Sequence, residues 1–294
     1  MRALRPFVSL LAAAALAGCV AGIPAETRER LDAVAVVGLL GDDVRHVDRE
    51  WWRETYFEEV CTYDTYNRRR FRRCWLEPRT RTMSRVLGVH VAPLTGGDVD
   101  AAAVAVFRDR VAQAAVVVRV VPADFGELPF GAVAAPPAED GALAPAVVER
   151  LRAIAQKTGA HGVVVLQGEC AGPAGGCWAA SVERSRQAGP YGGFSPWAPS
   201  GRFHAWLFDP AKGAIVSRWS APETKFVRAG WGQQAPPPAI AGSLGGALDP
   251  AAAQAAAQAI RYAMAELADD FACAMTGGGA CERSTAPPPP AAAP

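Results

Sequence analysis

Four glutamates lie close together in the sequence, and glutamate carboxyl groups are among those that glycan hydrolysis uses. Glycosidases use two carboxyl groups, one as an acid and the other as a base or nucleophile. Such a pair could come from Glu50, Glu54, Glu58 and Glu59. Surface acids have the same composition, so an enzyme that uses carboxylates of residues 48–59 stays an alternative hypothesis.

The other nucleophiles and metal-ligand types lack a catalytic spacing. His46 and Asp48 form an H-x-D pair without a third ligand at a recognisable distance, whereas zinc sites use three or four protein ligands. Ser195 lies in G-F-S-P-W, where the proline does not fit the strand-turn-helix context of a serine elbow. We therefore expect no catalytic residue, no metal site and no cofactor.

A second kind of chemistry is recognition by arginine and aromatic side chains. Residues 68–73 read RRRFRR, and eight aromatic residues fall within residues 51–75. Arginine beside Trp and Tyr is typical of binding hot spots, and arginine stacks on aromatic rings. The candidate partner-binding residues are Trp51, Trp52, Arg68, Arg69, Arg70, Phe71, Arg72 and Arg73. The alternative is a solvated hairpin whose arginines pair with neighbouring carboxylates, each exposed pair contributing little.

The amino terminus has the three parts of a bacterial secretory signal. Arg2 and Arg5 precede an apolar run at residues 7–16 that is too short to cross a membrane as a helix. The following Leu16-Ala17-Gly18-Cys19 resembles the lipobox of bacterial lipoproteins. The resemblance implies cleavage before Cys19 and acylation of this cysteine, and several acyl chains anchor a protein lastingly. The alternative is an ordinary signal peptide with a chance cysteine.

This resemblance also implies a location and a class of partner. Val20 follows the cysteine, and the absence of Asp there indicates the outer membrane, with the chain facing the periplasm. Removal of Arg2 and Arg5 changes the formal charge from +1 to about −1, so no nucleic-acid partner is expected. We expect contact with the membrane through the anchor and with an envelope protein or an anionic envelope surface. The oligomeric state stays open.

Six further cysteines form three pairs of near neighbours in the sequence. In an oxidising compartment an even set of this kind predicts disulfides. Proximity favours Cys61–Cys74, Cys170–Cys177 and Cys273–Cys281 among the fifteen possible pairings. None of these pairs has the C-x-x-C spacing of a redox or zinc site.

The remaining pattern alternates strands and helices. We expect strands at 33–40, 86–92, 115–121 and 161–168, helices after Asp98, over 143–158 and after Asp249-Pro250, a long loop at 169–200, and a hairpin around the turn DPAKG. This order predicts an α/β fold: a single mixed-sheet domain packed by about three helices, with long Pro/Gly-rich loops. The expected organisation is a signal peptide at 1–18, a lipidated tether at 19–30, the periplasmic domain at 31–276 and a Pro/Ala-rich disordered tail at 277–294.

The element order and the hairpin WLFDPAKGAIVSRW resemble envelope lipoproteins of the curli-secretion and penicillin-binding-protein-activator type, and the amino-terminal domain of TolB. This resemblance implies an assembly or accessory module. The main expectation is therefore a lipid-anchored envelope lipoprotein that binds a partner and is not an enzyme; the alternative is a cell-wall glycan-acting enzyme.

Overall fold

The computed structural model describes residues 22–66, 69–94, 98–114, 116–126, 143–170, 177–189, 192–200, 202–221 and 248–277. The predicted signal peptide, the predicted lipidation site Cys19 and nearly all of the predicted tail lie outside these residues.

A five-stranded mixed sheet forms the centre of the body. Its strand order is β11-β10-β5-β1-β4, with β1 at Ala33–Leu39, β4 at Arg119–Pro122, β5 at Gly162–Gln167, β10 at Phe203–Asp209 and β11 at Ala214–Ala221. Strand β1 runs parallel to β4 and β5, and β10 is antiparallel to β5 and β11. Strands covered on both faces are continuous apolar runs, which is why AVAVV and GVVVL were recognisable in the sequence. The predicted α/β class is confirmed.

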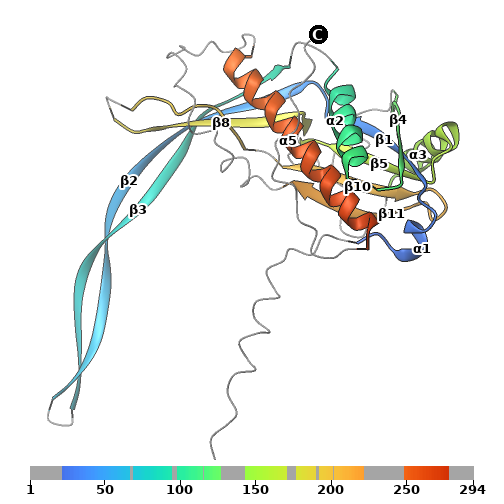
Figure 1. The fold of residues 1–294 in the computed structure, drawn as a ribbon. Coiled ribbons are helices and arrows are strands. Elements are labelled where there is room, and N and C mark those ends of the chain that lie inside the picture. The colour runs from blue at the N-terminus through green and yellow to red at the C-terminus, as the bar shows by residue number, and fades with distance from the viewer. Residues whose placement is uncertain are drawn as a thin grey trace, which may run out of the picture.

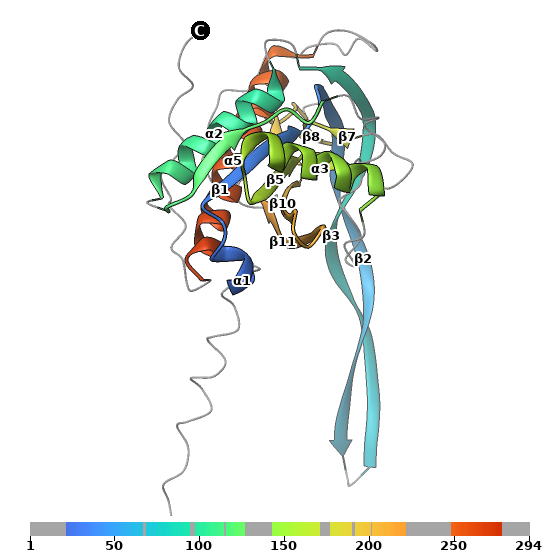
Figure 2. The same ribbon diagram turned by 90° about the vertical axis from the view of Figure 1, so that its right-hand side faces the viewer.

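Helices cover both faces of this sheet (Figures 1 and 2). Helices α2 (Val99–Gln113) and α5 (Pro250–Met275) pack on one face, and α3 (Pro145–Thr158) packs on the other. The predicted ends are confirmed. Asp98 caps α2 by accepting from the Ala101 N–H at 2.9 Å, and Gly159 ends α3 with a φ of 63°, which glycine adopts without strain.

Helix α5 supplies the largest packing surface to the body. Its stripe of Ile260, Met264, Leu267 and Phe271 is buried and forms a packing face. The Phe271 ring lies 5.7 Å from the ring of Phe107 on α2 and 5.7 Å from that of Trp219 on β11. The stripe thus joins both helices to the sheet.

A second sheet, of order β3-β2-β8-β9, lies beside the body. Its strands are β2 at Asp43–Tyr66, β3 at Arg69–Pro93, β8 at Ala180–Gln187 and β9 at Ala198–Pro199. A short third sheet pairs β6 (Glu169–Cys170) with β7 (Cys177–Trp178). The prediction of a long loop at 169–200 is therefore wrong for β8. Its sequence ASVERSRQ has little apolar alternation, and it is a strand because it pairs in parallel with β2.

The described part of the expected tether is docked on the body. Helix α1 (Ala25–Arg28) contains the buried Thr27. The Thr27 hydroxyl and the Arg30 guanidinium each donate to Asp209 Oδ2 at 2.9 Å. Asp209 also accepts from the backbone N–H of Ala211 in the β10–β11 turn. The buried Asp209 carboxylate therefore holds this segment against the body. Hydrophobic periodicity in the sequence does not predict a tertiary contact of this kind. Within the described part of the lipidated tether predicted at 19–30, Ile23 and Thr27 are buried.

Candidate functional site

The long hairpin formed by β2 and β3 is the most distinctive feature of the molecule. Its pairing runs from Asp43 opposite Pro93 to Tyr66 opposite Arg69. Strand β8 accompanies β2 only as far as Trp51 opposite Gln187. Beyond that point two strands project alone from the body (Figures 1 and 2), over roughly 50 Å at 3.4 Å per residue. We call this projecting part, Trp52–Tyr66 with Arg69–Met83, the ribbon.

The sequence predicted only a strand at 86–92 and a closed loop at 61–74 here, and it missed the length of the hairpin. The signal that could have found it is the run of Thr, Tyr, Trp, Phe and Val between charged residues, which are the strand-favouring types. The charged residues made this strand signal hard to recognise, because they interrupt the apolar alternation that is typical of a half-buried strand.

One face of the hairpin carries a ladder of ion pairs, which we call the charged face. It joins Arg85 to Glu50 at 2.6 Å, Arg81 to Glu54 at 2.9 Å and Arg79 to Glu58 at 3.0 Å. These three acids lie on β2 and the three arginines lie on β3. Arg79 also pairs at 3.0 Å with Glu77, an acid of β3 that lies opposite Glu58. The rings between them belong to the same face, because Arg81 lies over Tyr56 and Arg85 over Trp52, at 5.2 and 5.9 Å from the ring centroids.

The opposite face of the ribbon mixes exposed apolar side chains with threonines and a few charged residues. It carries the disulfide between Cys61 and Cys74, which confirms that predicted pair, and we call it the disulfide face. Phe57, Tyr63 and Leu76 on this face are 64%, 62% and 65% exposed. Phe57 and Leu76 are diagonal neighbours across the two strands, and Tyr63 lies beyond the disulfide. Three large apolar side chains exposed on one projecting element are a feature of interaction surfaces.

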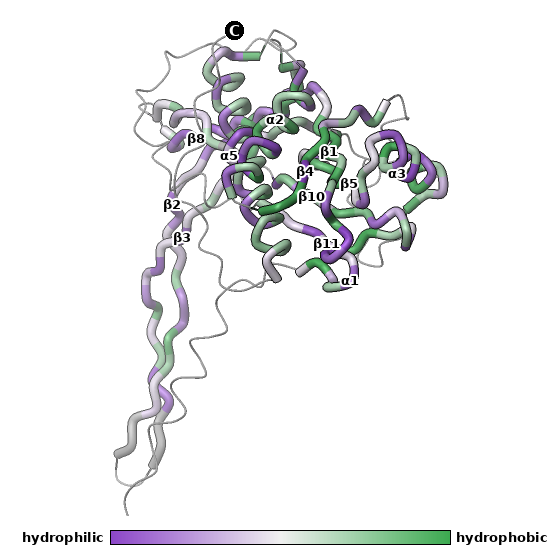
Figure 3. The backbone as a smooth tube through the Cα atoms, turned by 45° about the vertical axis from the view of Figure 1, so that its right-hand side comes forward, coloured by the Kyte–Doolittle hydropathy of each residue, from purple (hydrophilic) through white to green (hydrophobic). Residues whose placement is uncertain are grey.

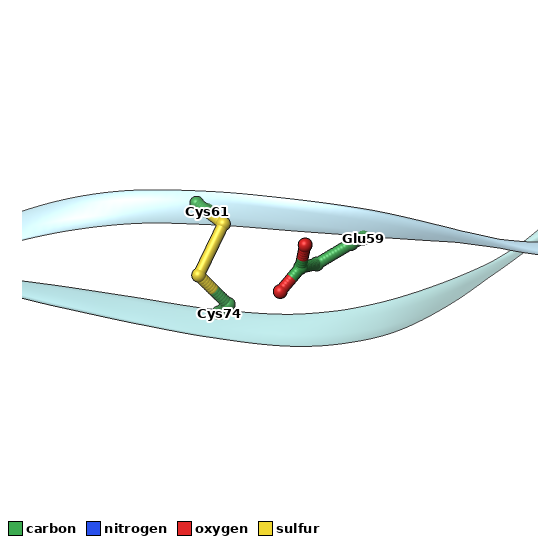
Figure 4. Close-up of side chains that lie close together, drawn as sticks. All are labelled: Glu59, Cys61 and Cys74. Atoms are coloured by element: carbon green, nitrogen blue, oxygen red, sulfur yellow. A yellow bond between two sulfur atoms is a disulfide. The ribbon is translucent and has the colours of Figure 1, made fainter.

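Glu59 lies beside the disulfide on this face (Figure 4). Its carboxylate and the two sulfurs lie within 4.8 Å of one another. The metal ligand of a cysteine is its thiolate, and the sulfurs of Cys61 and Cys74 are bonded to each other. In this oxidised form the group offers a metal ion only one carboxylate.

Replacing Cys61 and Cys74 by serine is expected to loosen the ribbon and leave the body intact. The disulfide joins residues 13 apart in sequence, and closing a loop of this size contributes about 3 kcal/mol in the chain-entropy account. Hydrogen exchange should show faster exchange for the amides of the ribbon and unchanged exchange for β1 and β5. Equal protection of the ribbon in both proteins would contradict the prediction.

Most of the other predicted recognition and disulfide residues lie on described strands and on helix α5. Trp51, Trp52, Arg72 and Arg73 lie on β2 and β3, and the Arg72 guanidinium donates to Cys61 Sγ at 3.2 Å. The backbone of Arg69, Arg70 and Phe71 belongs to β3, while Arg68 lies outside the described residues. The backbone of Cys170 pairs with that of Cys177. Cys273 is disulfide-bonded, and its predicted partner Cys281 lies outside the described residues.

The glutamates proposed for glycan hydrolysis are held by arginines. Glu50 accepts from Arg85 with Oε2, and Arg186 lies 3.2 Å from its Oε1. The hydrogen bond from Arg85 lowers the pKa of Glu50, whereas a general acid needs a raised pKa. Glu54 and Glu58 are engaged by Arg81 and Arg79 in the same ladder. These contacts speak against a catalytic assignment for the three side chains.

The root of the hairpin is built on a half-buried histidine. The His46 ring on β2 stacks on Trp197 at 5.7 Å and meets the His90 ring of β3 edge-on at 5.0 Å. Arg184 on β8 pairs with Asp48 at 2.7 Å and lies 4.5 Å from the Trp197 centroid. Burial lowers the pKa of His46, and the nearby His90 and Arg184 lower it further.

Acidification is therefore expected to destabilise the protein. In the unfolded chain His46 binds a proton near its ordinary pKa of about 6.5. In the folded chain its pKa is lower, so the proton binds only at a more acidic pH. The contribution of neutral His46 to the free energy of unfolding is fully present above this pH. It is lost as the pH drops through this value, by at most about 1.4 kcal/mol per pH unit for each such histidine. His204, whose pKa is also lowered by burial, adds to the effect. Thermal unfolding between pH 7.5 and 5.5 should show a shallower loss for His46→Gln, and an unchanged slope would refute this role.

A hollow of about 420 Å³ lies where β1 ends and α2 begins. Three carboxylates line it, from Asp98, Asp100 and Asp124. Asp100 accepts from the Leu40 N–H at 2.7 Å, and burial raises the pKa of its carboxyl. The carboxylates of Asp98 and Asp100 already occupy the positive, amino-terminal end of α2, where an anion would bind. They would repel a phosphate, so this hollow is unsuited to one.

No family model, curated protein or solved structure matches this chain. Among the helices of the described residues, none has the length and apolarity that a membrane crossing requires.

Proposed function

We propose that this protein is a lipid-anchored binding module of the bacterial cell envelope that contacts its partner with the β2–β3 ribbon. The observation that carries the proposal is the exposure of Phe57, Tyr63 and Leu76 on an element that adds nothing to the core of the body. Figure 3 shows apolar segments alternating with polar ones along this projecting hairpin.

The physical state of the ribbon supports a binding role. An isolated two-stranded hairpin is marginally stable in water, yet this one is reinforced by a disulfide and by an ion-pair ladder. These links hold together the two strands that carry the exposed aromatic and aliphatic side chains. A surface ordered in advance loses less conformational entropy when a partner binds.

The sequence supports the location. The lipobox-like Leu16-Ala17-Gly18-Cys19 is the expected anchor, and the cysteine pairing suits an oxidising compartment. Anchored at Cys19 in the outer membrane and facing the periplasm, the protein meets envelope proteins and anionic envelope surfaces, not nucleic acid. Its role is that of an accessory module without a catalytic reaction.

Capture of partners from solubilised envelope membranes tests the proposal. The triple change Phe57→Ser, Tyr63→Ser and Leu76→Ser should reduce the captured partner at least about tenfold, since central apolar anchors each contribute more than about 1 kcal/mol. The matched control is Val117→Ser, because Val117 is 95% exposed on the body. Equal capture by the triple variant and the control would contradict the proposal.

A further inference from the structure

Within the part of the chain that the structure describes, the ribbon has two free backbone edges. There β3 is an edge strand of the second sheet, and β2 has no strand neighbour except β3 once β8 ends opposite Trp51. The Trp51 carbonyl accepts from Ala188 on the β8 side, so the odd-numbered residues that follow on β2 direct their backbone groups to that same outer edge. Unpaired edges of this length are templates for pairing with another strand.

The distribution of charge selects which strand fits each edge. On the charged face β2 carries Glu50, Glu54 and Glu58, and β3 carries the arginines that pair with them. Glu77 on β3 is an acid of the same face, but Arg79 pairs with it, so arginines still outnumber acids on β3 and a strand like β3 suits the free edge of β2. Pairing two β2 edges would bring glutamates together, and pairing two β3 edges would bring arginines together; like charges opposite each other destabilise a sheet. A second β2–β3 hairpin placed beside the first in the same orientation offers its β3 to the free β2 edge, antiparallel and with opposite charge.

The exposed part of the ladder can engage this second hairpin. Glu54 and Glu58 accept with Oε2 from arginines of their own hairpin, and Oε1 of a carboxylate can accept from another guanidinium. The side chains of the Arg79–Glu58 and Arg81–Glu54 pairs are 44–53% exposed. Pro78 on β3 lies opposite Phe57, and a proline is tolerated where its missing N–H faces an outer edge. It therefore removes one donor from this edge and leaves the others.

We propose that the partner of the ribbon is a second copy of this chain, with the free β2 edge of one copy paired to the outer β3 edge of the next. The contact is head-to-tail, so each copy has one free edge left for a further copy. This inference rests on the proposed function and names a partner of the same ribbon, bound at its edges rather than on its disulfide face.

A charge-swapped hairpin tests the inference in the full-length protein. The variant Glu54→Arg, Glu58→Arg, Glu77→Arg, Arg79→Glu and Arg81→Glu keeps the ion pairs of these residues with every sign reversed. At low ionic strength, where exposed charges are least screened, wild type and variant should each sediment as dimers or larger species. In mixtures of two differently tagged proteins, co-purification of wild type with variant should be at least about tenfold below that of wild type with wild type.

Three results would overturn the inference: monomers of both proteins at all concentrations, mixed complexes as abundant as unmixed ones, or mixed complexes in excess. The last would show that like edges pair. If both proteins are monomeric while the triple change at Phe57, Tyr63 and Leu76 still abolishes partner capture, the second-copy inference fails and the proposed function stands.

Discussion

Replacing Phe271 by alanine is expected to destabilise the body by about 3–5 kcal/mol, the range for truncating a buried aromatic side chain. Phe271 is fully buried. Its ring touches those of Phe107 and Trp219, so the cavity would open at the point where α5, α2 and the central sheet meet. Because these three elements are held in place by one another, little relaxation is available to fill the space.

Denaturant unfolding measures this loss, with Phe57→Ala as the matched control. Phe57 is 64% exposed, so its removal should change the free energy of unfolding by less than about 1 kcal/mol. If the two substitutions destabilise the protein equally, the account of α5 as the main packing helix is wrong.

Removing the ribbon is expected to abolish partner capture and to leave the body folded. Trp52 pairs with Met83, so residues 53–82 can be replaced by Asn-Gly, which forms the two-residue turn that suits a hairpin. The core clusters lie in the central sheet, the base of the second sheet and the helices, so thermal unfolding of the shortened protein should match that of the wild type within a few degrees. Capture from envelope membranes should fall to background.

Two results would count against this separation of roles. Unfolding of the shortened body would show that the ribbon is a structural part of the domain. Unchanged capture by a folded, shortened protein would place the binding surface elsewhere. The hairpin root at His46 and Trp197 is retained in the shortened protein, so the comparison isolates the projecting strands.

The central part of the fold could be predicted from sequence because its elements bury regular patterns. Strands β1 and β5 are apolar runs, Gly159 and Asp98 mark helix ends, and the turn with Gly213 at a φ of 66° lies in the expected β10–β11 hairpin. Each of these signals is local, and each agrees with the tertiary structure.

The elements that were missed depend on pairing rather than on local pattern. Strand β8 is polar along most of its length and is a strand through its parallel register with β2. The ribbon is exposed on both faces, so no apolar alternation marks it. Residues 61–74 were recognised as disulfide-closed and rich in arginine, but the cross-strand ion pairs appear only when the register places Glu54 opposite Arg81.

Photo-crosslinking from the hairpin in intact envelopes tests the central claim most directly. A photoreactive amino acid placed at Phe57 or Leu76 should yield covalent adducts with a partner chain. The same group at Lys157, in the last turn of α3 on the body, should yield none. Adducts from the two ribbon positions alone are what a projecting, partner-binding hairpin predicts; an absence of adducts there, or equal adducts from Lys157, would contradict it.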